Sequence, residues 1–567
     1  MNRYAIQHIV DSSYCFPVSE HEIVLRLRTA KDDIKTASVL YENKYVISER
    51  QFKGEMTKSY TSELFDYFTI KLDLEDTRLG YVFYVNDGES NYYFSEDGIT
   101  DTYDFSRGFY NFFQYPYINK VDIMEGVKWM KKAVFYEIFV DRFYQGDQQK
   151  DLSYINCEWG ELPKPNTFAG GDLKGIIEKL DYIKGLGANT IYLTPVFESV
   201  SNHKYDISNY KKVDEHFGSS EDLKELVNQA HSMDMRIVLD AVFNHCSENM
   251  MEFQDVVEKG RDSEYFDWFI IYGDRPVKSK HNYETFASCD YMPKFNTSNQ
   301  EVQDFLIDIA CYYIDEFHID GWRLDVSDEV SHEFWRNFRK AVKKADQDAV
   351  IIGENWHDAY SYLRGDQYDS IMNYAFAKGC LDYFATGALD AEQFAYKLND
   401  ILMRNSDTVN SMMLNLLDSH DTHRFYSEVG ENKEKMMAAL SALYLFPGVP
   451  CIFYGTETLT SGGYDPDCRR CMNWEKAQDS ENDVAKYLKK LSDIRQESCL
   501  ADGTTQIYSE NDVFIIKIQT EDKQVELYIN NTEKAATVDN REFVQFSHCI
   551  YLNGSIYVGS EPYLKSC

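Results

Sequence analysis

The sequence predicts a multidomain protein: a central (β/α)8 barrel with an inserted loop domain, an N-terminal β-sandwich and a C-terminal antiparallel β-domain. First, 567 residues exceed what one hydrophobic core usually holds. Second, apolar strands alternate with amphipathic helices through the middle of the chain. Third, both ends alternate with period two, which is typical of antiparallel sheets. The expected domains are 1–122, 123–498 with an insertion at 246–298, and 499–567.

The N-terminal segment alternates apolar and polar residues in three stretches, 23–28, 68–74 and 81–85. Inward apolar and outward polar residues at this period indicate half-buried strands. The turn sequence Asn-Asp-Gly at 86–88 separates such strands and favours a hairpin. We therefore expect an antiparallel sandwich here. An ordinary sandwich with no functional role is an alternative, because sandwiches share architecture without sharing function.

Strand and helix begin to alternate at Ala133, where the apolar run 133–143 predicts the first barrel strand. A helix is expected at 172–184, because its apolar residues fall on one side. A strand follows at 190–195, and Ser219 with Asp222 predicts a capping box that opens the next helix. The alternation continues to about residue 454 and gives about eight strands, the number in a (β/α)8 barrel.

One long stretch, from Cys246 to about Ser298, lacks steady periodicity and is expected to be a loop or a small domain of its own. The helix after it, near 302–317, carries a full apolar stripe that we interpret as core packing. The apolar run 438–454 contains Pro-Gly-Val-Pro, so it predicts a helix, a turn and a buried strand. A last helix at 483–497 precedes strands of period two in the C-terminal domain.

Four of the predicted barrel strands end in acids, histidines or an arginine. The carboxyl ends of barrel strands meet on one rim, where active sites of this fold are built. Polar residues from separate strands are therefore expected to converge there. The converging residues are Asp240, Asn244 and His245, then Arg323 and Asp325, then Glu354 and Trp356, and finally Asp418, His420 and Asp421.

Two carboxylates among these residues suit the cleavage of an acetal. One acid must protonate the leaving oxygen, and a second, ionised carboxylate must meet the charge that grows at the sugar carbon. Asp325 suits the ionised role because Arg323 is expected to lower its pKa, and Glu354 suits the acid role at a buried strand end. The alternative for Arg323 and Asp325 is a purely structural ion pair.

The four strand ends, in this order, resemble the four signature regions of the alpha-amylase family of glycoside hydrolases. The sandwich and the stretch Met-Pro-Lys-Phe-Asn at 292–296 resemble the neopullulanase, cyclomaltodextrinase and maltogenic amylase branch. This resemblance implies retaining hydrolysis of α-1,4-glucosidic bonds in cyclodextrins, maltooligosaccharides or pullulan through a covalent glycosyl-enzyme intermediate. It also implies an oligosaccharide partner and a homodimer formed through the N-terminal domain.

The resemblance also assigns roles to individual residues. Asp325 is expected as the nucleophile, Glu354 as the acid/base and Asp421 as the third catalytic carboxylate, which grips sugar hydroxyls. For His245 and His420, an ordinary buried histidine is the alternative, and for Asp465 with Arg469 a surface salt bridge. The expected substrate-binding residues are Tyr205, His245, Arg323, Glu329, Trp356, His420, Asp465 and Arg469.

Two other functions remain open at this point. A transglycosylase would pass the glycosyl intermediate to a sugar instead of water. How well the acceptor site excludes water decides between hydrolysis and transfer. A non-catalytic binding or scaffold protein could use the same fold, since fold does not imply activity. That alternative requires a lost carboxylate, whereas Asp325, Glu354 and Asp421 are all present.

Composition excludes some partners and compartments. A net charge of −36 repels phosphate backbones and anionic lipid, so neither nucleic acid nor membrane is an expected partner. The first residues lack the apolar core of a signal peptide, and we expect a cytoplasmic protein.

The twelve cysteines are scattered along the chain, which is typical of free thiols that form no disulfide bonds. Cys468 and Cys471 have the spacing of a metal or redox pair, but no second pair or nearby histidine completes it.

No cofactor is expected to be required. Asp147, Asp151 and Asp172 resemble a calcium loop of some family members near the first strand. Lys150 stands where an oxygen-rich residue is expected, so its ammonium group could occupy the cation's place. Glu329 likewise replaces a histidine that many secreted members use beside calcium, which argues against a calcium ion in the inserted domain.

Overall fold

The computed structural model describes residues 1–497, 500, 502–559 and 563–564. The chain forms two compact units. One comprises Val127–Thr386 and Met412–Asp502, and the other comprises Met1–Gly126, Gly387–Ser411 and Gly503–Cys567. Each unit is described by itself.

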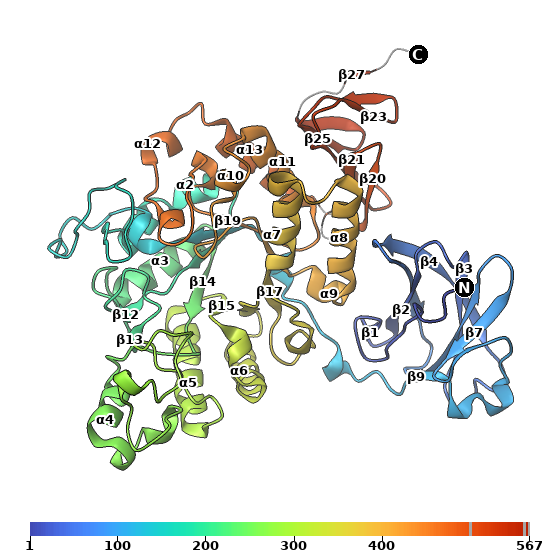
Figure 1. The fold of residues 1–567 in the computed structure, drawn as a ribbon, viewed down its shortest axis with the longest axis horizontal. Coiled ribbons are helices and arrows are strands. Elements are labelled where there is room, and N and C mark those ends of the chain that lie inside the picture. Colours follow the sequence, from blue (N-terminus) through green and yellow to red (C-terminus); the bar gives the residue numbers. More distant parts are fainter. Residues whose placement is uncertain (498–499, 501, 560–562, 565–567) are drawn as a thin grey trace. The chain divides into compact units, whose positions relative to one another are not determined.

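The first unit is built on a closed barrel of parallel strands, which confirms the predicted central fold (Figure 1). The strands are buried throughout, except for the half-buried Arg236 at one end, as expected for a sheet covered by helices. In the order of the barrel, the strands are β10 (Phe135–Ile138), β11 (Thr190–Leu193), β14 (Arg236–Ala241), β15 (Gly321–Leu324), β16 (Val350–Gly353), β17 (Ser370–Asn373), β18 (Leu414–Leu416) and β19 (Val449–Phe453).

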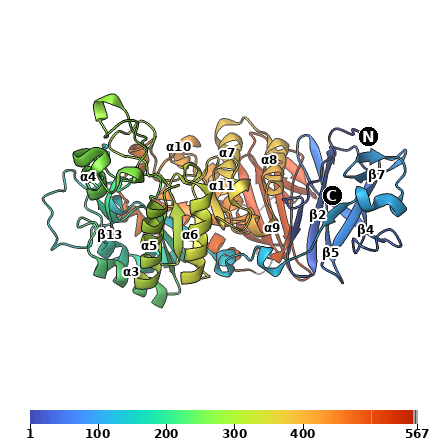
Figure 2. The same ribbon diagram turned by 90° about the horizontal axis from the view of Figure 1, so that it is seen from below.

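Helices cover the outside of these strands, and α5 and α6 lie side by side in both views (Figure 1 and Figure 2). The predicted capping box opens α3: the Ser219 side chain accepts from the Asp222 N–H, and Asp222 accepts from the Ser219 N–H. The apolar stripe predicted for 302–317 lies in the core face of α5. The main helices are α3 (Ser220–Ser232), α5 (Gln300–Phe317), α6 (His332–Ala345), α7 (Tyr374–Cys380), α11 (Lys433–Leu445) and α13 (Asp483–Arg495).

One predicted helix differs from the structure. The stretch 172–184 forms two short helices, α1 (Leu173–Glu178) and α2 (Leu180–Gly185), because Lys179 between them departs from helical geometry at φ −107° and ψ 6°. Asp172 caps α1 through the Gly175 N–H. The apolar periodicity survives such a break, since both helices still bury the same face, so the pattern alone did not reveal it.

Two excursions from the barrel lie beside its carboxyl-end rim. A short hairpin pairs β12 (Phe197–Ser199) with β13 (Ile207–Val213). The long segment between β14 and α5 contains α4 (Met251–Lys259) and several one-turn helices. Its end returns to β14, where the Phe295 N–H donates to the Asn244 carbonyl at 3.0 Å. That bond fixes the insertion next to the polar end of a barrel strand.

The second unit contains a nine-stranded antiparallel sheet near the N-terminus, folded around its own apolar core. Strands from both halves of the sheet contribute to that core, as the period-two pattern predicted. The strands are β1 (Cys15–Pro17), β2 (Glu22–Ala30), β3 (Thr36–Glu42), β4 (Phe52–Thr61), β5 (Phe65–Asp73), β6 (Leu79–Asn86), β7 (Asn91–Ser95), β8 (Gly98–Thr100) and β9 (Phe113–Tyr115).

This second unit also contains α8 (Ala391–Met403), α9 (Asp407–Asn410) and the C-terminal strands. The Asn399 amide on α8 donates to the Thr61 carbonyl at 2.8 Å and to the Ile507 carbonyl at 3.0 Å, so this helix joins both β-domains. The C-terminal sheet pairs β20 (Thr504–Glu510), β21 (Val513–Gln519), β22 (Gln524–Asn530), β25 (Ser547–Leu552) and β26 (Ser555–Gly559), and a smaller sheet pairs β23 (Ala536–Val538), β24 (Arg541–Phe543) and β27 (Tyr563–Leu564).

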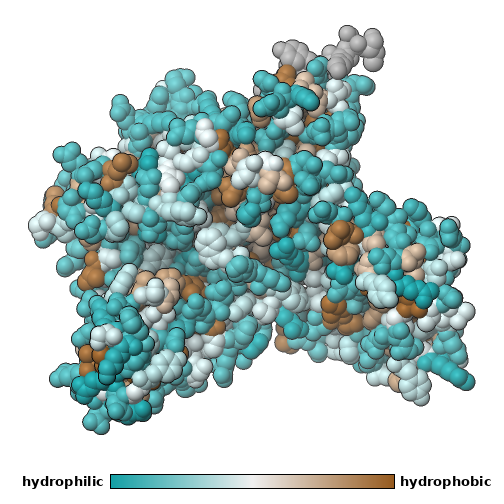
Figure 3. Space-filling view, in the orientation of Figure 1, coloured by the Kyte–Doolittle hydropathy of each residue, from teal (hydrophilic) through white to brown (hydrophobic). Residues whose placement is uncertain are grey.

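Hydrophilic residues dominate the face drawn in Figure 3, and hydrophobic residues appear there in scattered patches. This distribution fits the acidic composition. In the part of the chain that the structure describes, none of the helices has an apolar stretch long enough to span a lipid bilayer.

Candidate active site

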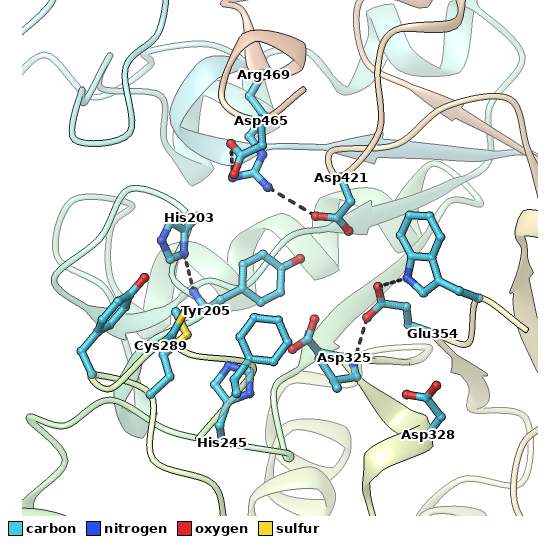
Figure 4. A pocket seen from close by; sticks show the side chains of 15 residues that line it. His203, Tyr205, His245, Cys289, Asp325, Asp328, Glu354, Asp421, Asp465 and Arg469 are labelled. Carbon is cyan, nitrogen blue, oxygen red and sulfur yellow. Dashed lines mark hydrogen bonds and ion pairs between the residues drawn. The ribbon is translucent and has the colours of Figure 1, made fainter. Parts of the chain in front are cut away.

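A pocket of about 490 Å³ lies at the carboxyl ends of the barrel strands. Three acidic side chains, Asp325, Glu354 and Asp421, point into it from different sides (Figure 4). They come from the ends of β15, β16 and β18, so the strand ends converge as predicted. The remaining lining residues are His203, Tyr205, His245, Phe286, Cys289, Tyr291, Met292, Val326, Asp328, Trp356, Asp465 and Arg469.

Arg323 lies beneath the pocket, fully buried on β15. Its Nη1 donates to Asp325 Oδ1 at 2.9 Å and to Asp240 Oδ2 at 3.0 Å. Its Nη2 forms an ion pair with Glu354 Oε2 at 3.1 Å. The planar guanidinium can contact several carboxylates at once, so this single side chain holds the acids of three strands together.

The burial of Asp325 and the nearby Glu354 carboxylate both affect the pKa of Asp325. Burial raises the pKa of Asp325 well above its ordinary value, and the Glu354 charge adds to this rise, whereas Arg323 opposes it. Arg323 alone would lower this pKa, so the lowered pKa expected from the sequence is wrong in direction. Like charges close together in one buried site are unfavourable, so the neighbouring Glu354 charge disfavours the ionised form of Asp325.

Glu354 is held by two donors besides the arginine. Its Oε2 accepts from the Val326 N–H at 2.9 Å, and its Oε1 accepts from the Trp356 indole N–H at 3.0 Å. Val326 has φ +46°, an uncommon conformation for a β-branched residue that aims its N–H at the carboxylate. Trp356 stacks on Tyr374 with ring centroids 3.7 Å apart. The Glu354 carboxylate is therefore fixed in orientation.

Asp421 faces the other two carboxylates across the pocket (Figure 4). Arg469 Nη2 lies 3.3 Å from its Oδ1, and His420 Nε2 lies 3.1 Å from its Oδ2. Although burial raises the pKa of Asp421, the His420 and Arg469 charges outweigh it and leave the pKa below its ordinary value. Arg469 also pairs with Asp465 at 2.9 Å, so Asp465 and Asp421 share one cation.

Aromatic and imidazole rings form another wall. The Tyr205 hydroxyl donates to Asp240 Oδ2 at 2.9 Å, and the ring lies parallel to His420 with an interplanar angle of 9°. Phe286, from the inserted segment, stacks on His245 with ring centroids 4.9 Å apart. Burial, aided by the Lys294 charge, lowers the pKa of His245 to about 3, so this imidazole is neutral. Its Nε2 has no hydrogen-bond partner within the described part of the chain.

The structure places the predicted site residues in three groups. Eight of them line the pocket: Asp325, Glu354, Asp421, Tyr205, His245, Trp356, Asp465 and Arg469. Arg323 and His420 lie directly behind the lining, both fully buried. Glu329 is outside the lining and pairs with Lys294 at 3.0 Å.

Several lining residues were not predicted, namely His203, Phe286, Cys289, Tyr291, Met292, Val326 and Asp328. Four of these come from the segment without periodicity, whose path could not be derived from the pattern. Glu137, behind His420, was also missed. A carboxylate inside the apolar strand sequence Val-Phe-Tyr-Glu-Ile-Phe-Val was the available signal.

The acidic residues considered for calcium do not form a calcium site. Lys150 Nζ lies 2.8 Å from Asp172 Oδ2 and donates to the Gly170 carbonyl at 2.9 Å and the His216 carbonyl at 2.8 Å. Asp147 instead pairs with Lys174 at 2.7 Å, and Asp151 accepts from the hydroxyl and N–H of Ser153. An ammonium group already occupies the centre of the oxygen ligands, so a divalent cation does not fit.

Among the described residues, no group of three or more His, Cys, Asp or Glu side chains is arranged to hold a metal ion. Cys468 and Cys471 are both buried free thiols, and the Cys468 thiol donates to the His420 carbonyl at 3.2 Å. Cys468 therefore packs behind the pocket.

Comparison with known families and proteins gives matches over most of the chain. The family model "Alpha amylase, catalytic domain" matches residues 137–501, and "Alpha amylase, N-terminal ig-like domain" matches residues 1–119. A cyclomaltodextrinase of Thermoanaerobacter pseudethanolicus is 41% identical over 543 residues, which are 95% of this chain and 94% of that protein. Neopullulanase 2 of Thermoactinomyces vulgaris is 39% identical over 546 residues, covering 94% of this chain and 92% of its own length.

Solved structures give the same result. A structure described as a cyclomaltodextrinase superposes with a TM-score of 0.90 and 36% identity, and the match covers 95% of this chain and 93% of that one. Ligand-free cyclic alpha-maltosyl-(1-->6)-maltose hydrolase from Arthrobacter globiformis superposes with a TM-score of 0.72 and 34% identity, covering 75% of this chain and 99% of that one.

Proposed function

The chain belongs to the alpha-amylase family of glycoside hydrolases, and from this premise we propose that it hydrolyses α-1,4-glucosidic bonds with retention of anomeric configuration. The observation that carries the proposal is the single guanidinium of Arg323 between Asp325 and Glu354. One cation in contact with both groups holds the two carboxyls close together. A spacing of about 5 Å favours a covalent intermediate, whereas wider pairs admit a water molecule between acid and sugar.

Asp325 acts as the nucleophile and Glu354 as the general acid. Glu354 gives its proton to the leaving oxygen, while ionised Asp325 bonds to the anomeric carbon. Water then attacks the glycosyl-enzyme, Glu354 takes up the proton of that water, and Asp325 is released. Trp356 and the Val326 N–H keep the Glu354 carboxyl aimed at the leaving oxygen through both steps.

Asp421 and the surrounding rings bind the sugar at the reacting subsite. Ionised Asp421 accepts hydrogen bonds from sugar hydroxyls and favours the distorted ring of the transition state. The free Nε2 of neutral His245 gains a hydroxyl partner when substrate enters. Tyr205 offers an aromatic face to the apolar face of the same sugar. Asp465 and Arg469 hold the next sugar on the non-reducing side.

The preferred substrates are cyclodextrins, short maltooligosaccharides or pullulan. The support comes from the relatives, which are named cyclomaltodextrinase, neopullulanase and maltogenic alpha-amylase and match this chain along nearly its whole length. In the site itself, Asp325, Glu354 and Asp421 are each paired with an arginine, which suits an uncharged ligand. No metal ion is required, because Lys150 supplies the cation next to Asp172.

Two further properties belong to this proposal. A homodimer forms through the N-terminal domain, whose surface exposes large apolar side chains including Phe109, Tyr110 and Val121. Such side chains on an acidic surface suit burial against a second copy. The protein is cytoplasmic, a location supported by a relative from Bacillus subtilis named intracellular maltogenic amylase.

Proton NMR of the first products of β-cyclodextrin hydrolysis tests the mechanism. We expect the α-anomer to appear first and the β-anomer to grow only by mutarotation. Initial release of the β-anomer would overturn the retaining mechanism. Chromatography of the products of β-cyclodextrin, pullulan and soluble starch, each at equal mass, tests the substrate preference. A rate on starch above both others would exclude it.

A further inference from the structure

We propose that Glu137, on the first strand of the barrel, is a positioning residue that holds His420 doubly protonated and thereby orients the Asp421 carboxylate. The inference rests on the proposed function, in which Asp421 binds sugar hydroxyls. Neither Glu137 nor His420 lines the cavity, so both residues act on the substrate from behind the residues that do.

Glu137 and His420 are in direct contact, and both are fully buried. Glu137 Oε1 accepts from His420 Nδ1 at 2.5 Å and from the His420 backbone N–H at 3.2 Å. The Glu137 backbone is fixed, because β10 pairs with β11 on one side and β19 on the other. Two bonds from a rigid strand to one residue fix both the position of the loop and the orientation of the ring.

The other ring nitrogen of His420 faces two hydrogen-bond acceptors. His420 Nε2 lies 3.1 Å from Asp421 Oδ2 and 2.6 Å from the Tyr205 hydroxyl oxygen. The Tyr205 hydroxyl already donates its only hydrogen to Asp240, so its oxygen is free to accept. Glu137 accepts at Nδ1, and Tyr205 and Asp421 accept at Nε2. Both nitrogens therefore carry hydrogen, which makes the ring an imidazolium.

The charges around the ring support this assignment. Burial lowers the pKa of His420, but the carboxylates Asp421 and Glu137 outweigh it and leave the pKa above its ordinary value, while Arg323 opposes them. Glu137 in turn is a buried carboxylate, which is costly without a cation. The charged or titratable groups around His420 and Glu137 are Glu137 on β10, Tyr192 on β11, Tyr205 before β13, Asp240 on β14, Arg323 on β15, Asp418 and Asp421 after β18, Cys451 on β19, and Cys468 and Arg469 after β19.

Loss of the Glu137 charge has a consequence in the pocket. His420 would then release a proton at lower pH, and its Nε2 would become an acceptor facing the Asp421 carboxylate. Two acceptors at 3.1 Å repel each other, so Asp421 would turn or bind a proton itself. Either change removes a negatively charged acceptor for sugar hydroxyls. Glu137 thus acts on the substrate only through His420 and Asp421.

The decisive variant is Glu137→Gln, which keeps the side-chain size and an acceptor oxygen for Nδ1–H but removes the charge. Ring-carbon NMR of histidine-labelled protein follows His420, whose signal is identified by its absence in His420→Gln. We expect His420 to lose its proton above pH 6.5 in the wild type, and at least about one pH unit lower in Glu137→Gln, because a nearby opposite charge shifts a pKa by about 1–3 units. Identical titrations in the two proteins would overturn the proposal.

The kinetic readout is the pH profile of kcat/KM on β-cyclodextrin. We expect Glu137→Gln to lose about tenfold more activity at pH 8 than at pH 6, relative to wild type, since one pKa unit corresponds to tenfold. The matched control is Glu428→Gln, which removes the carboxylate that contacts His423 Nδ1 outside the pocket. Its profile should follow the wild type. An equal loss in Glu137→Gln at both pH values indicates a merely structural role and refutes the positioning role.

The two readouts separate this inference from the proposed function. If His420 responds to Glu137→Gln but the wild type hydrolyses no glucan, the proposed function fails and the coupling of Glu137 to His420 stands. If the wild type is active and the His420 signal does not respond, the inference alone fails. Should Glu137→Gln not fold, the wild-type titration still decides, because a neutral His420 at pH 6 contradicts the proposal.

Discussion

Arg323 Nη1 lies 2.9 Å from Asp325 Oδ1, and both side chains are more than nine-tenths buried. This contact joins two positions only two residues apart on β15, so both side chains face the inside of the barrel rim. The same guanidinium contacts Asp240 and Glu354 from the neighbouring strands. Arg323 therefore sets the spacing of the carboxylates on which the proposed chemistry depends.

The first prediction concerns those carboxylates. Glu354→Gln and Asp325→Asn should each lower kcat by at least about 10²-fold, because each removes a proton or charge that the transition state uses. Both variants should fold, since amides fit the same space. Turnover of β-cyclodextrin, with circular dichroism as the folding check, is the measurement.

The matched control is Asp328→Asn, an acid that lines the same pocket without contacting Arg323. The kcat of Asp328→Asn should fall by less than about tenfold, as expected of a group that does not interact with the transition state. If folded Glu354→Gln or Asp325→Asn kept more than about a tenth of the wild-type rate, its role would be wrong, because proton-transfer groups typically contribute at least 10²-fold.

The second prediction concerns the lysine beside the first strand. Chelators should leave the activity and melting temperature of the wild type unchanged. Lys150→Ala should instead lower stability by about 1–3 kcal/mol, because it removes a donor to the Gly170 and His216 carbonyls and the cation paired with the buried Asp172 carboxylate. Differential scanning calorimetry with and without chelator measures both effects. A wild-type melting temperature that falls on chelation and recovers only with calcium would contradict this reading, because such recovery requires an ion bound to the folded state.

The third prediction is a loss of stability in mild acid. His8 is buried in the N-terminal domain, where it contacts the Arg26 carbonyl and the Tyr81 hydroxyl. Burial lowers its pKa from 6.5 to about 4. The unfolded chain therefore binds a proton below pH 6.5 that the folded chain does not bind until about pH 4. The contribution is present above pH 6.5 and disappears as pH falls to about 4, with a maximum near 3 kcal/mol, or roughly 1.4 kcal/mol per unit.

Comparison of wild type with His8→Gln isolates this contribution. Melting temperatures measured from pH 7.5 to 4.5 should fall less steeply for His8→Gln than for the wild type, whatever its stability at neutral pH. The carboxylates that also titrate in acid are common to both proteins and cancel in the difference. Parallel curves would mean that His8 does not titrate in this window.

The strand ends of the barrel could be predicted because each is a local signal. An apolar run followed by an acid predicts a buried strand and marks the carboxyl end of that strand, as at Asp240, Asp325 and Glu354. The position of each residue on the rim then follows from the closed parallel order of the strands. This is why the three carboxylates and Arg323 could be placed together without coordinates.

The rest of the site depends on contacts that the local pattern does not carry. Glu137 and His420 lie 283 residues apart, and only the closure of the barrel between β10 and β19 brings them together. Phe286 contacts His245 from a segment that lacks hydrophobic periodicity, so its path could not be predicted from the sequence. The direction of the Asp325 pKa shift was missed for the same reason, because burial and Glu354 outweigh the sequence neighbour Arg323.

The last prediction concerns the N-terminal domain and the size of the substrate. As the family resemblance implies, a second copy that pairs through this domain should narrow the entrance to the active site and favour small rings over branched polymers. Deleting residues 1–120 is a poor test, because it removes the Thr61 carbonyl and Arg26, which bond to Asn399 and to the Asn405 carbonyl in the α8–α9 region.

Two surface substitutions test the same idea in the folded chain. Phe109 and Tyr110 are 67% and 87% exposed, so Phe109→Asp with Tyr110→Asp should cost the fold little. We expect this variant to be monomeric by light scattering and to show a higher ratio of starch to β-cyclodextrin hydrolysis than the wild type. Val200→Asp, at an exposed apolar residue of the barrel unit, is the matched control and should leave both unchanged. A wild type that is already monomeric and cleaves soluble starch faster than β-cyclodextrin at equal mass would remove the basis of the size argument, since no second copy would be present to restrict entry.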